Sequence, residues 1–162
     1  MRILVTGARG LLGAAIMREF RGEDVHGFGH DQLDIADEAA VTDAIASIGP
    51  DVVINCAAYN DVDRAERESE TALRINALGV LALARGVRQA GAVLVHYSTD
   101  FVFDGEADRP YTEDDAPNPR GVYAASKLLG DWFAADAGRA YVLRVDSLFG
   151  EPNPGGGRRG SL

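Results

Sequence analysis

A glycine-rich turn near the start of the chain constrains the fold more than any other stretch. It follows an apolar run at residues 2–6 and precedes apolar residues repeated every four positions, as on one face of a helix. The turn reads G-x-x-G-x-x-G, with its glycines at Gly7, Gly10 and Gly13. A strand, a tight turn and a helix in this order are typical of a dinucleotide-binding unit, and a glycine-rich turn without a ligand is the alternative.

The three glycines have different expected roles. Gly7 allows the sharp turn, Gly10 lets a pyrophosphate approach the backbone, and Gly13 permits close packing of the helix on the strand. The helix N-terminus faces the phosphates, because its free amide groups attract negative charge. We therefore assign Leu11 and Leu12, where the helix begins, to the cofactor site as well.

Strands and helices alternate along the rest of the chain. Further apolar strands are expected at residues 25–28, 52–54, 92–97 and 141–145. Helical segments lie between them, and a long one ends before Gly91. This pattern predicts an α/β fold with an open, doubly wound parallel sheet covered on both faces, the Rossmann-like class. We assign residues 1–150 to this NAD(P)-binding domain and residues 151–162 to a loop.

The residues after the second strand bear on the choice of nicotinamide cofactor. NAD-specific sites hold the ribose 2′-hydroxyl with an acidic residue about 20 positions after the glycines, but residues 27–30 read Gly-Phe-Gly-His. Arg9 in the glycine turn is near enough to meet a 2′-phosphate, which favours NADPH, while Asp31 leaves NADH possible. Asp34 and Ile35 are placed to border an adenine, although Asp34 could equally be a turn residue.

Small residues follow the third strand, at the point where a cofactor lies close to the backbone of a parallel sheet. They are Ala57 and Ala58, and with the adjoining Tyr59 we assign them to the cofactor site. Farther along, Asn76 interrupts an otherwise apolar helix. It either satisfies a backbone carbonyl or holds a water molecule behind Lys127.

A tyrosine and a lysine four residues apart, Tyr123 and Lys127, form the candidate catalytic pair. If a helix begins after the preceding proline-rich loop, the two side chains share one face. The nearby cation is then expected to lower the pKa of the phenol from about 10 toward the working range of a general acid. Thr99, at the end of the preceding strand, is placed to hydrogen-bond a substrate oxygen beside that phenol. A chance pair at helical spacing is the alternative, and the glycine motif in the same chain favours catalysis.

Three other side chains are predicted to be structural. Trp132 continues the helix of the catalytic pair as part of a core face and is expected to pack inside rather than stack on a ligand. His96 lies within a strand, and Cys56 is expected to be an inert core thiol.

Charge and composition exclude several classes of partner. The 162 residues carry 16 basic and 25 acidic side chains, a formal net charge of −9, which disfavours nucleic acid and anionic membrane surfaces. No apolar run approaches the roughly 20 residues needed to cross a bilayer, and the start is too short for a signal peptide. The single cysteine excludes an intrachain disulfide, so we expect a cytoplasmic protein, and we predict no metal site.

Several segments together carry a resemblance to a known family. They are residues 6–13, 55–59, 62–66, 98–105, 110–111 and 123–128 with Gly130. In these segments the chain resembles the dTDP-4-dehydrorhamnose reductase family, within the extended short-chain dehydrogenases and reductases. The resemblance implies reduction of a nucleotide-linked 4-keto-6-deoxy sugar to its 4-hydroxy form with NADPH or NADH.

The same resemblance implies roles for individual residues. Tyr123 is then the proton donor. Lys127 binds the nicotinamide ribose and lowers the pKa of Tyr123, and Thr99 and Asp100 contact the sugar. The related nucleotide-sugar 4,6-dehydratases typically carry a glutamate where this chain has Phe101, so dehydration is not expected. A nucleotide-sugar epimerase, which shares the tyrosine and lysine, stays an alternative.

The chain also departs from the family pattern. Gly121 replaces the family's asparagine two residues before the tyrosine, Ala124 replaces the glycine after it, and Leu148 stands where the reductases commonly place a tryptophan. Family members continue into a substrate domain that is largely missing here, with residues 151–162 leading toward it. The alternatives are therefore a truncated or regulatory cofactor-binding module without turnover, similar to the regulatory subunit of methionine adenosyltransferase, and a homo-oligomer or a chain complemented by another.

Overall fold

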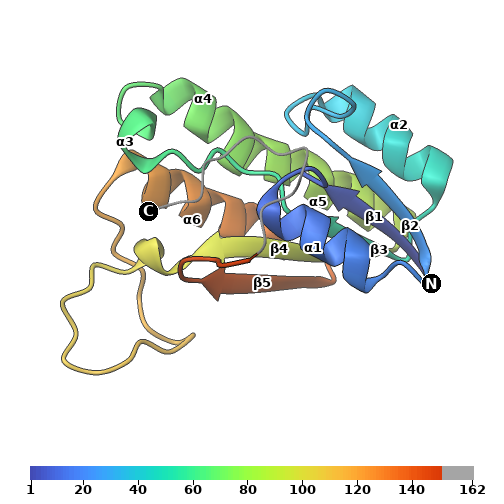
Figure 1. Ribbon diagram of the computed structural model, residues 1–162. Helices are drawn as coiled ribbons and strands as arrows, with labels where there is room; N and C mark the ends of the chain where they lie inside the picture. Colours follow the sequence, from blue (N-terminus) through green and yellow to red (C-terminus); the bar gives the residue numbers. More distant parts are fainter. Residues whose placement is uncertain (151–162) are drawn as a thin grey trace.

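The computed structural model describes residues 1–150, which form one α/β unit around a five-stranded parallel sheet. The strands are β1 (Arg2–Thr6), β2 (Asp24–Phe28), β3 (Val52–Asn55), β4 (Val93–Thr99) and β5 (Ala140–Val145). They lie in the order β2-β1-β3-β4-β5 (Figure 1). This is the predicted doubly wound, Rossmann-like fold, whose ligand crevice lies outside the carboxyl ends of the strands. The loop predicted at residues 151–162 lies outside the described residues.

Helices cover the two faces of the sheet to different extents. The main helices are α1 (Leu11–Glu19) on one face, and α2 (Glu38–Ile48), α5 (Gly79–Ala90) and α6 (Val122–Ala135) on the other (Figure 1). Short pieces are α3 (Val62–Ala65), α4 (Ser69–Leu73), the π-helical turn η1 (Arg74–Leu78) and the 3₁₀ turn η2 (Asp100–Val102). Tyr141 and Leu143 of β5 are 65% and 40% exposed, so within the described residues the predicted cover is incomplete over β5.

Capping residues mark the ends of α2 and α5, and Gly91 lies where the sequence predicts the end of the long helix. Asp37 caps α2, because its side chain accepts a hydrogen bond from the Ala40 amide at 3.0 Å. Gly49 closes α2 and Gly91 closes α5, each in the left-handed conformation, with φ of 59° and 68°. The long predicted helix is continuous from α4 through η1 to α5.

The core explains why the strands read as uninterrupted apolar runs. Ile3, Leu4 and Val5 are all fully buried, Leu4 toward α2 and α5 and its two neighbours toward α1. A parallel strand that is covered on both faces has no solvent side, so alternation disappears from its sequence. No helix of residues 1–150 is long and apolar enough to cross a membrane.

The prediction that Trp132 packs in the core is wrong, since its side chain is 60% exposed. The buried stripe of α6 runs instead through Ala124, Lys127, Leu128, Asp131 and Ala134. Two of these five positions carry charged side chains, which an apolar pattern does not mark as buried. Hydropathy therefore misplaced Trp132 on this helix.

Candidate active site at the carboxyl edge of the sheet

The glycine turn packs closely on the segment that follows β3. Gly7 has a φ of 65°, and a Cβ on it would lie 2.7 Å from the amide nitrogen of Ala57. A Cβ on Gly13 would strike the carbonyl oxygen of Gly7. The predicted roles of Gly7 in the turn and of Gly13 in close packing are therefore confirmed.

The start of α1 presents backbone amides that no side chain of residues 1–150 caps. Gly10 is the N-cap, and its own amide donates to Gly7 O at 2.9 Å. Leu11 and Leu12 follow in the first turn and are half-buried. Uncapped amides at a helix N-terminus suit a pyrophosphate, so the residues present fit a dinucleotide.

A buried hydrogen-bond chain fixes the segment after β3 beside this turn. Thr6 Oγ1 donates to Asn55 Oδ1 at 2.6 Å, and the same oxygen accepts from the Ala57 amide at 3.1 Å. Ala58 and Tyr59 follow and are half-buried. The predicted cofactor segment thus adjoins the glycine turn, and its contact with a cofactor stays a prediction.

An exposed ion pair lies beyond the carboxyl end of β2. Arg9 Nη1 is 2.7 Å from Asp31 Oδ1, and both side chains are more than half exposed. A Cβ on Gly29 would contact both of them, which places the pair beside the strand end. A cation there suits a ribose 2′-phosphate and a carboxylate suits a 2′-hydroxyl, so both cofactors stay open.

Asp34 has the turn role that the sequence left open. Its Oδ1 accepts from the Ala36 amide and its Oδ2 from Arg74 Nη1, each at 3.0 Å. Ile35 is 3% exposed and packs beneath α5, where a Cβ on Gly79 would lie 2.7 Å from it. The Ile35 side chain therefore belongs to the core, and contact of this pair with an adenine stays a prediction.

The predicted catalytic residues meet at the carboxyl end of β4. The phenol of Tyr123, in the first turn of α6, lies beside Thr99, whose side chain acts to lower the pKa of the phenol. Thr99 Oγ1 also lies 3.1 Å from Asp100 Oδ1 and accepts from the Phe101 amide at 3.2 Å. The Phe101 ring packs edge-on against Tyr123, with centroids 6.1 Å apart. The structure thus brings together Tyr123 and Thr99, which are predicted to be catalytic, and Asp100, which is predicted to face the sugar.

The pKa of Tyr123 is raised above its ordinary value, so the expectation that Lys127 lowers it is wrong. Burial is the main cause, the side chain of Thr99 works against it, and the charge of Asp100 adds to it. The Lys127 ammonium is directed elsewhere, because its Nζ donates to the carbonyl oxygen of Tyr97 at 2.6 Å. A buried phenol that keeps its proton suits a proton donor.

Lys127 is 3% exposed and is the only lysine in the sequence. Burial lowers its pKa to about 8, while the negative charge of Asp131 and the Cys56 sulfur act in the opposite direction. The ammonium is therefore close to losing its proton at physiological pH.

Asn76 lies in η1 and joins three segments of the site. Its Oδ1 accepts from the Tyr59 amide at 2.8 Å, and its Nδ2 donates to Tyr59 O and Ser126 Oγ at 3.0 Å each. Of the two alternatives, the bond to a backbone carbonyl is confirmed. Because Ser126 precedes Lys127 on α6, Asn76 fixes the helix of the catalytic pair against the segment that follows β3.

Glu66, just after α3, contributes to the site in a way that the sequence did not predict. Its Oε1 accepts from the Val122 amide at 2.7 Å and so caps α6. A Cβ on Gly121 would lie 2.8 Å from that oxygen, so the carboxylate occupies the space beside Gly121. The one available signal was that Gly121, just before the helix, has no capping side chain.

Glu66→Ala is expected to lower the free energy of unfolding by about 1 kcal/mol, the usual effect of removing an N-cap acceptor. Urea denaturation measures this change. Glu70→Ala, at an exposed carboxylate of α4, is the matched control and is expected to change stability by less than about 0.5 kcal/mol. Equal losses in the two variants would contradict the capping role.

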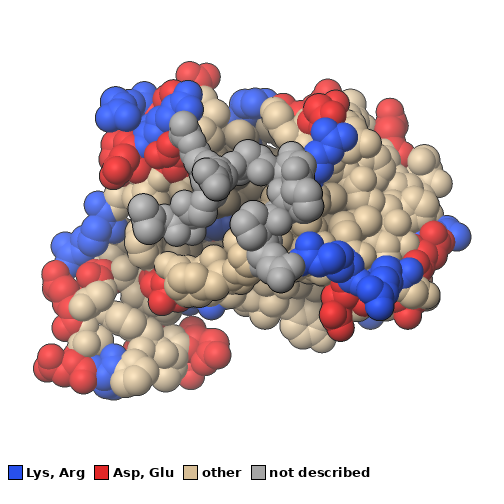
Figure 2. Space-filling model, in the orientation of Figure 1, with Lys and Arg blue, Asp and Glu red and all other residues tan. Residues whose placement is uncertain are grey.

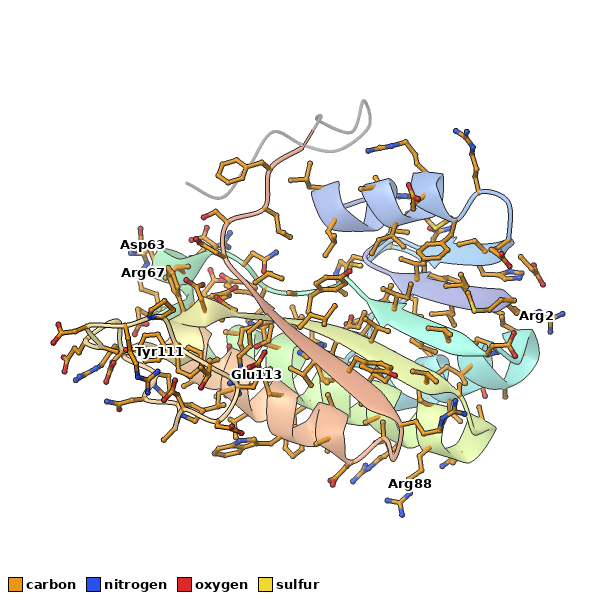
Figure 3. The ribbon with its side chains drawn as sticks, turned by 90° about the horizontal axis from the view of Figure 1, so that it is seen from below. Arg2, Asp63, Arg67, Arg88, Tyr111 and Glu113 are labelled. Carbon is orange, nitrogen blue, oxygen red and sulfur yellow. The ribbon has the colours of Figure 1, made fainter. Side chains whose placement is uncertain are left out.

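A cavity of about 560 Å³ opens beside Tyr123. Its lining includes Val62, Phe101, Phe103, Tyr111 and the carboxylates of Asp63, Glu66, Asp100 and Asp104. Figure 3 shows Asp63 and Tyr111 at one end of the molecule and Arg2, at the start of β1, at the other. Carboxylates can accept hydrogen bonds from sugar hydroxyls, so the cavity suits the sugar part of a ligand.

The loop at residues 103–121 forms the outer wall of this cavity and is held by its own side chains. The Phe103 and Tyr111 rings stack with centroids 4.4 Å apart. Asp104 accepts from Tyr111 Oη at 2.6 Å and from Asn118 Nδ2 at 2.8 Å, and hydrogen bonds, chiefly that of Tyr111, hold its pKa at about 2. Figure 2 shows this projecting segment, at the lower left, rich in acidic side chains.

Comparison with known proteins places these features in a family. The family model described as RmlD substrate binding domain matches residues 1–157. The dTDP-4-dehydrorhamnose reductase of Streptomyces griseus is 42% identical over 157 residues, covering 94% of this chain and 52% of the relative. Methionine adenosyltransferase 2 subunit beta of Danio rerio is 41% identical over 160 residues, covering 93% and 49%. The chain spans about half the length of the curated relatives it matches.

Solved structures agree with this result. A dTDP-4-dehydrorhamnose reductase from Clostridium acetobutylicum has a TM-score of 0.91 and 40% identity, covering 93% of this chain and 55% of that one. The reductase from Bacillus anthracis, solved in complex with NADP, has a TM-score of 0.90 and 36% identity, covering 93% and 54%. The predicted resemblance is confirmed, and the chain belongs to the dTDP-4-dehydrorhamnose reductase family.

Proposed function

We propose that this chain is the NADPH-binding half of a reductase that acts on a nucleotide-linked 4-keto-6-deoxy sugar. The observation that carries the proposal is the meeting of Thr99, Tyr123 and buried Lys127 at the carboxyl edge of the sheet that also holds the glycine turn. Relatives of about twice the length bear the name dTDP-4-dehydrorhamnose reductase, which supports the substrate class.

The residues present would hold NADPH at three places. The amides at the start of α1 would hold the pyrophosphate, Arg9 the 2′-phosphate, and Lys127 the nicotinamide ribose. The bound cofactor supplies a hydride to the carbonyl carbon of the sugar. The NADP complex of the Bacillus anthracis reductase supports NADPH, and Asp31 beside Arg9 keeps NADH as an alternative.

Side chains of this chain then protonate and orient the carbonyl oxygen of the sugar. Tyr123 donates its proton as negative charge develops there, and its raised pKa keeps that proton available at neutral pH. Thr99 lies beside the phenol and orients the same oxygen. The adjoining carboxylate-lined cavity would receive the sugar hydroxyls, while the nucleotide diphosphate would be held by the part of the relatives that this chain does not span.

NADPH titration and a reduction assay test the proposal. The purified chain is expected to bind NADPH, measured by the fluorescence of the nicotinamide, and to reduce dTDP-4-keto-6-deoxyglucose slowly or not at all. Absence of NADPH binding would refute the proposal. Turnover at the rate of a full-length reductase would refute the need for the part that this chain does not span.

A module without turnover is the second candidate, favoured by the 41% identity to methionine adenosyltransferase 2 subunit beta. It predicts NADPH binding with no reduction even when the chain is in excess over the sugar. An epimerase would instead keep tightly bound NAD through purification and show no net cofactor oxidation.

NADPH affinity is expected to fall as the pH rises through about 8. Because burial lowers the pKa of Lys127 to about 8, the ammonium is present below this pH and lost above it. The pKa of Tyr123 is raised from 10.0, so the phenol stays protonated over the same range. Titrations at several pH values between 6 and 9 measure the effect, and an affinity constant across this range would contradict the role of Lys127.

A further inference from the structure

A group of buried polar side chains behind Tyr123 has no part in the function proposed above. Asp131 of α6 is 5% exposed, and His96 and Ser98 of β4 are 0% and 4% exposed. Asp131 follows Lys127 by four residues, so the two side chains are neighbours on the buried face of the helix. Burying a carboxylate costs free energy unless a cation or hydrogen bonds compensate it, so its partners matter.

A hydrogen bond satisfies one oxygen of Asp131. Arg144 of β5 donates to Oδ2, with Nε 3.2 Å away. Oδ1 has no hydrogen-bond partner among the described residues, and His96 Nε2 lies 3.9 Å from it, beyond hydrogen-bond distance. Its negative charge is therefore available to another cation.

His96 does not supply that cation. Burial, and to a smaller extent the charge of Lys127, lowers the pKa of His96 to about 3, so the ring is neutral at physiological pH. Asn55 Oδ1 accepts from Thr6 and Ala57, which leaves Asn55 Nδ2 to donate to His96 Nδ1 at 3.0 Å. The ring proton is thus on Nε2, and the neutral ring brings no positive charge to Asp131.

Lys127 is the remaining cation, and it needs an anion. Its Nζ donates a hydrogen bond to a neutral group, the carbonyl oxygen of Tyr97. Cys56 also faces it, but burial raises the pKa of that thiol to about 12, so it carries no charge at neutral pH. The Ser98 hydroxyl is neutral as well. Among these neighbours, Asp131 is the acidic group. Burial raises the pKa of its carboxyl, and the charges of Arg144 and Lys127 act in the opposite direction, toward the carboxylate.

We propose that Asp131 is the buried counter-ion of Lys127 and keeps its ammonium charged at the nicotinamide end of the site. Asp131 is a positioning residue, because it acts through Lys127 and lines neither the cavity nor the glycine turn. That the Lys127 ammonium binds the cofactor rests on the proposed function. That Asp131 and Lys127 form a charge pair does not rest on it. Without this anion, burial favours the neutral amine more strongly.

The single lysine of the sequence gives a direct readout of the pairing. Chain labelled with ¹³C at lysine Cε yields one lysine signal, whose chemical shift follows protonation of Nζ. Without cofactor, the titration midpoint is expected near pH 8 in the wild type and lower by about one unit or more in Asp131→Asn. Asp136→Asn, at the exposed end of the same helix, is the matched control and is expected to leave the midpoint unchanged. An unchanged midpoint in Asp131→Asn would overturn the proposal.

A second variant keeps the test decisive if Asp131→Asn fails to fold. Arg144→Gln removes the cation that shares the carboxylate, at a side chain that is 26% exposed. The Lys127 midpoint is then expected to rise, because Asp131 has one competing cation fewer. A midpoint that stays or falls in Arg144→Gln would overturn the pairing.

NADPH binding by the same variants separates this inference from the proposed function. At pH 8 Asp131→Asn is expected to bind about fivefold more weakly than the wild type, the ratio of protonated fractions for a one-unit shift. At pH 6, where Lys127 is protonated in both, the affinities are expected to be equal. If the midpoints shift but neither protein binds NADPH, the proposed function fails and the pairing stands. Equal affinity at pH 8 despite a shifted midpoint would overturn the positioning role.

Discussion

Replacing Gly13 with valine is expected to reduce NADPH affinity more than tenfold and to destabilise the fold by about 1–3 kcal/mol. A Cβ at this position would strike Gly7 O and lie 2.8 Å from the Cα of Ala8. Both are backbone atoms, so no rotamer change relieves the contact. The start of α1 would move away from the turn, and its amides would no longer converge where a pyrophosphate lies. Fluorescence titration with NADPH and urea denaturation measure the two effects.

Gly22→Val is the matched control for this substitution. Gly22 is exposed, and a Cβ on it would meet no atom of the described part of the chain within 4 Å. We expect NADPH affinity and stability close to those of the wild type, within about 0.5 kcal/mol. A Gly13→Val chain that binds NADPH as tightly as this control would show that the glycine turn is not the cofactor site.

Tyr123→Phe is expected to slow reduction of the keto sugar by about 10²- to 10⁴-fold, the usual contribution of a positioned general acid. The variant removes the phenolic oxygen and keeps the ring that packs on Phe101, so the fold should be retained. NADPH affinity should change little, because the phenol donates its proton to the substrate only in the transition state. A single-turnover assay, with chain and NADPH in excess over the sugar, follows the loss of nicotinamide absorbance.

Tyr141→Phe provides the comparison for Tyr123→Phe. Tyr141 lies on β5, 65% exposed, and its hydroxyl serves neither the cavity nor the cofactor segment. The control is expected to reduce the sugar at the wild-type rate. Reduction by Tyr123→Phe at the same rate as this control would remove Tyr123 from the mechanism.

The sheet and the glycine turn could be predicted because their signals are local. Strands of a parallel sheet buried on both faces read as continuous apolar runs, as at residues 2–6 and 52–54. Turn and cap residues such as Gly7 and Gly91 have backbone requirements that few other residue types meet. These elements therefore appear in the structure where the sequence indicates them.

The electrostatics of the site could not be predicted, because they depend on burial and on partners distant in sequence. The spacing of Tyr123 and Lys127 correctly places both on α6, but it does not reveal that Tyr97 O takes the ammonium and that burial raises the phenol pKa. Likewise Glu66, in a run of mixed charges, gives no sign that it caps a helix 56 residues later. Asp131 was missed for the related reason that a charged residue on a buried helix face contradicts hydropathy.

The π-helical turn η1 makes the chain sensitive to length at one place. A π turn accommodates one residue more than the α-helix on either side of it. Deleting a single residue between Arg74 and Leu78 would restore an uninterrupted α-helix, which keeps α4 and α5 in register but removes the widened turn that holds Asn76. Asn76 would swing away from both Tyr59 and Ser126. An insertion or deletion that a surface loop tolerates would here break the contacts that join the segment after β3 to α6.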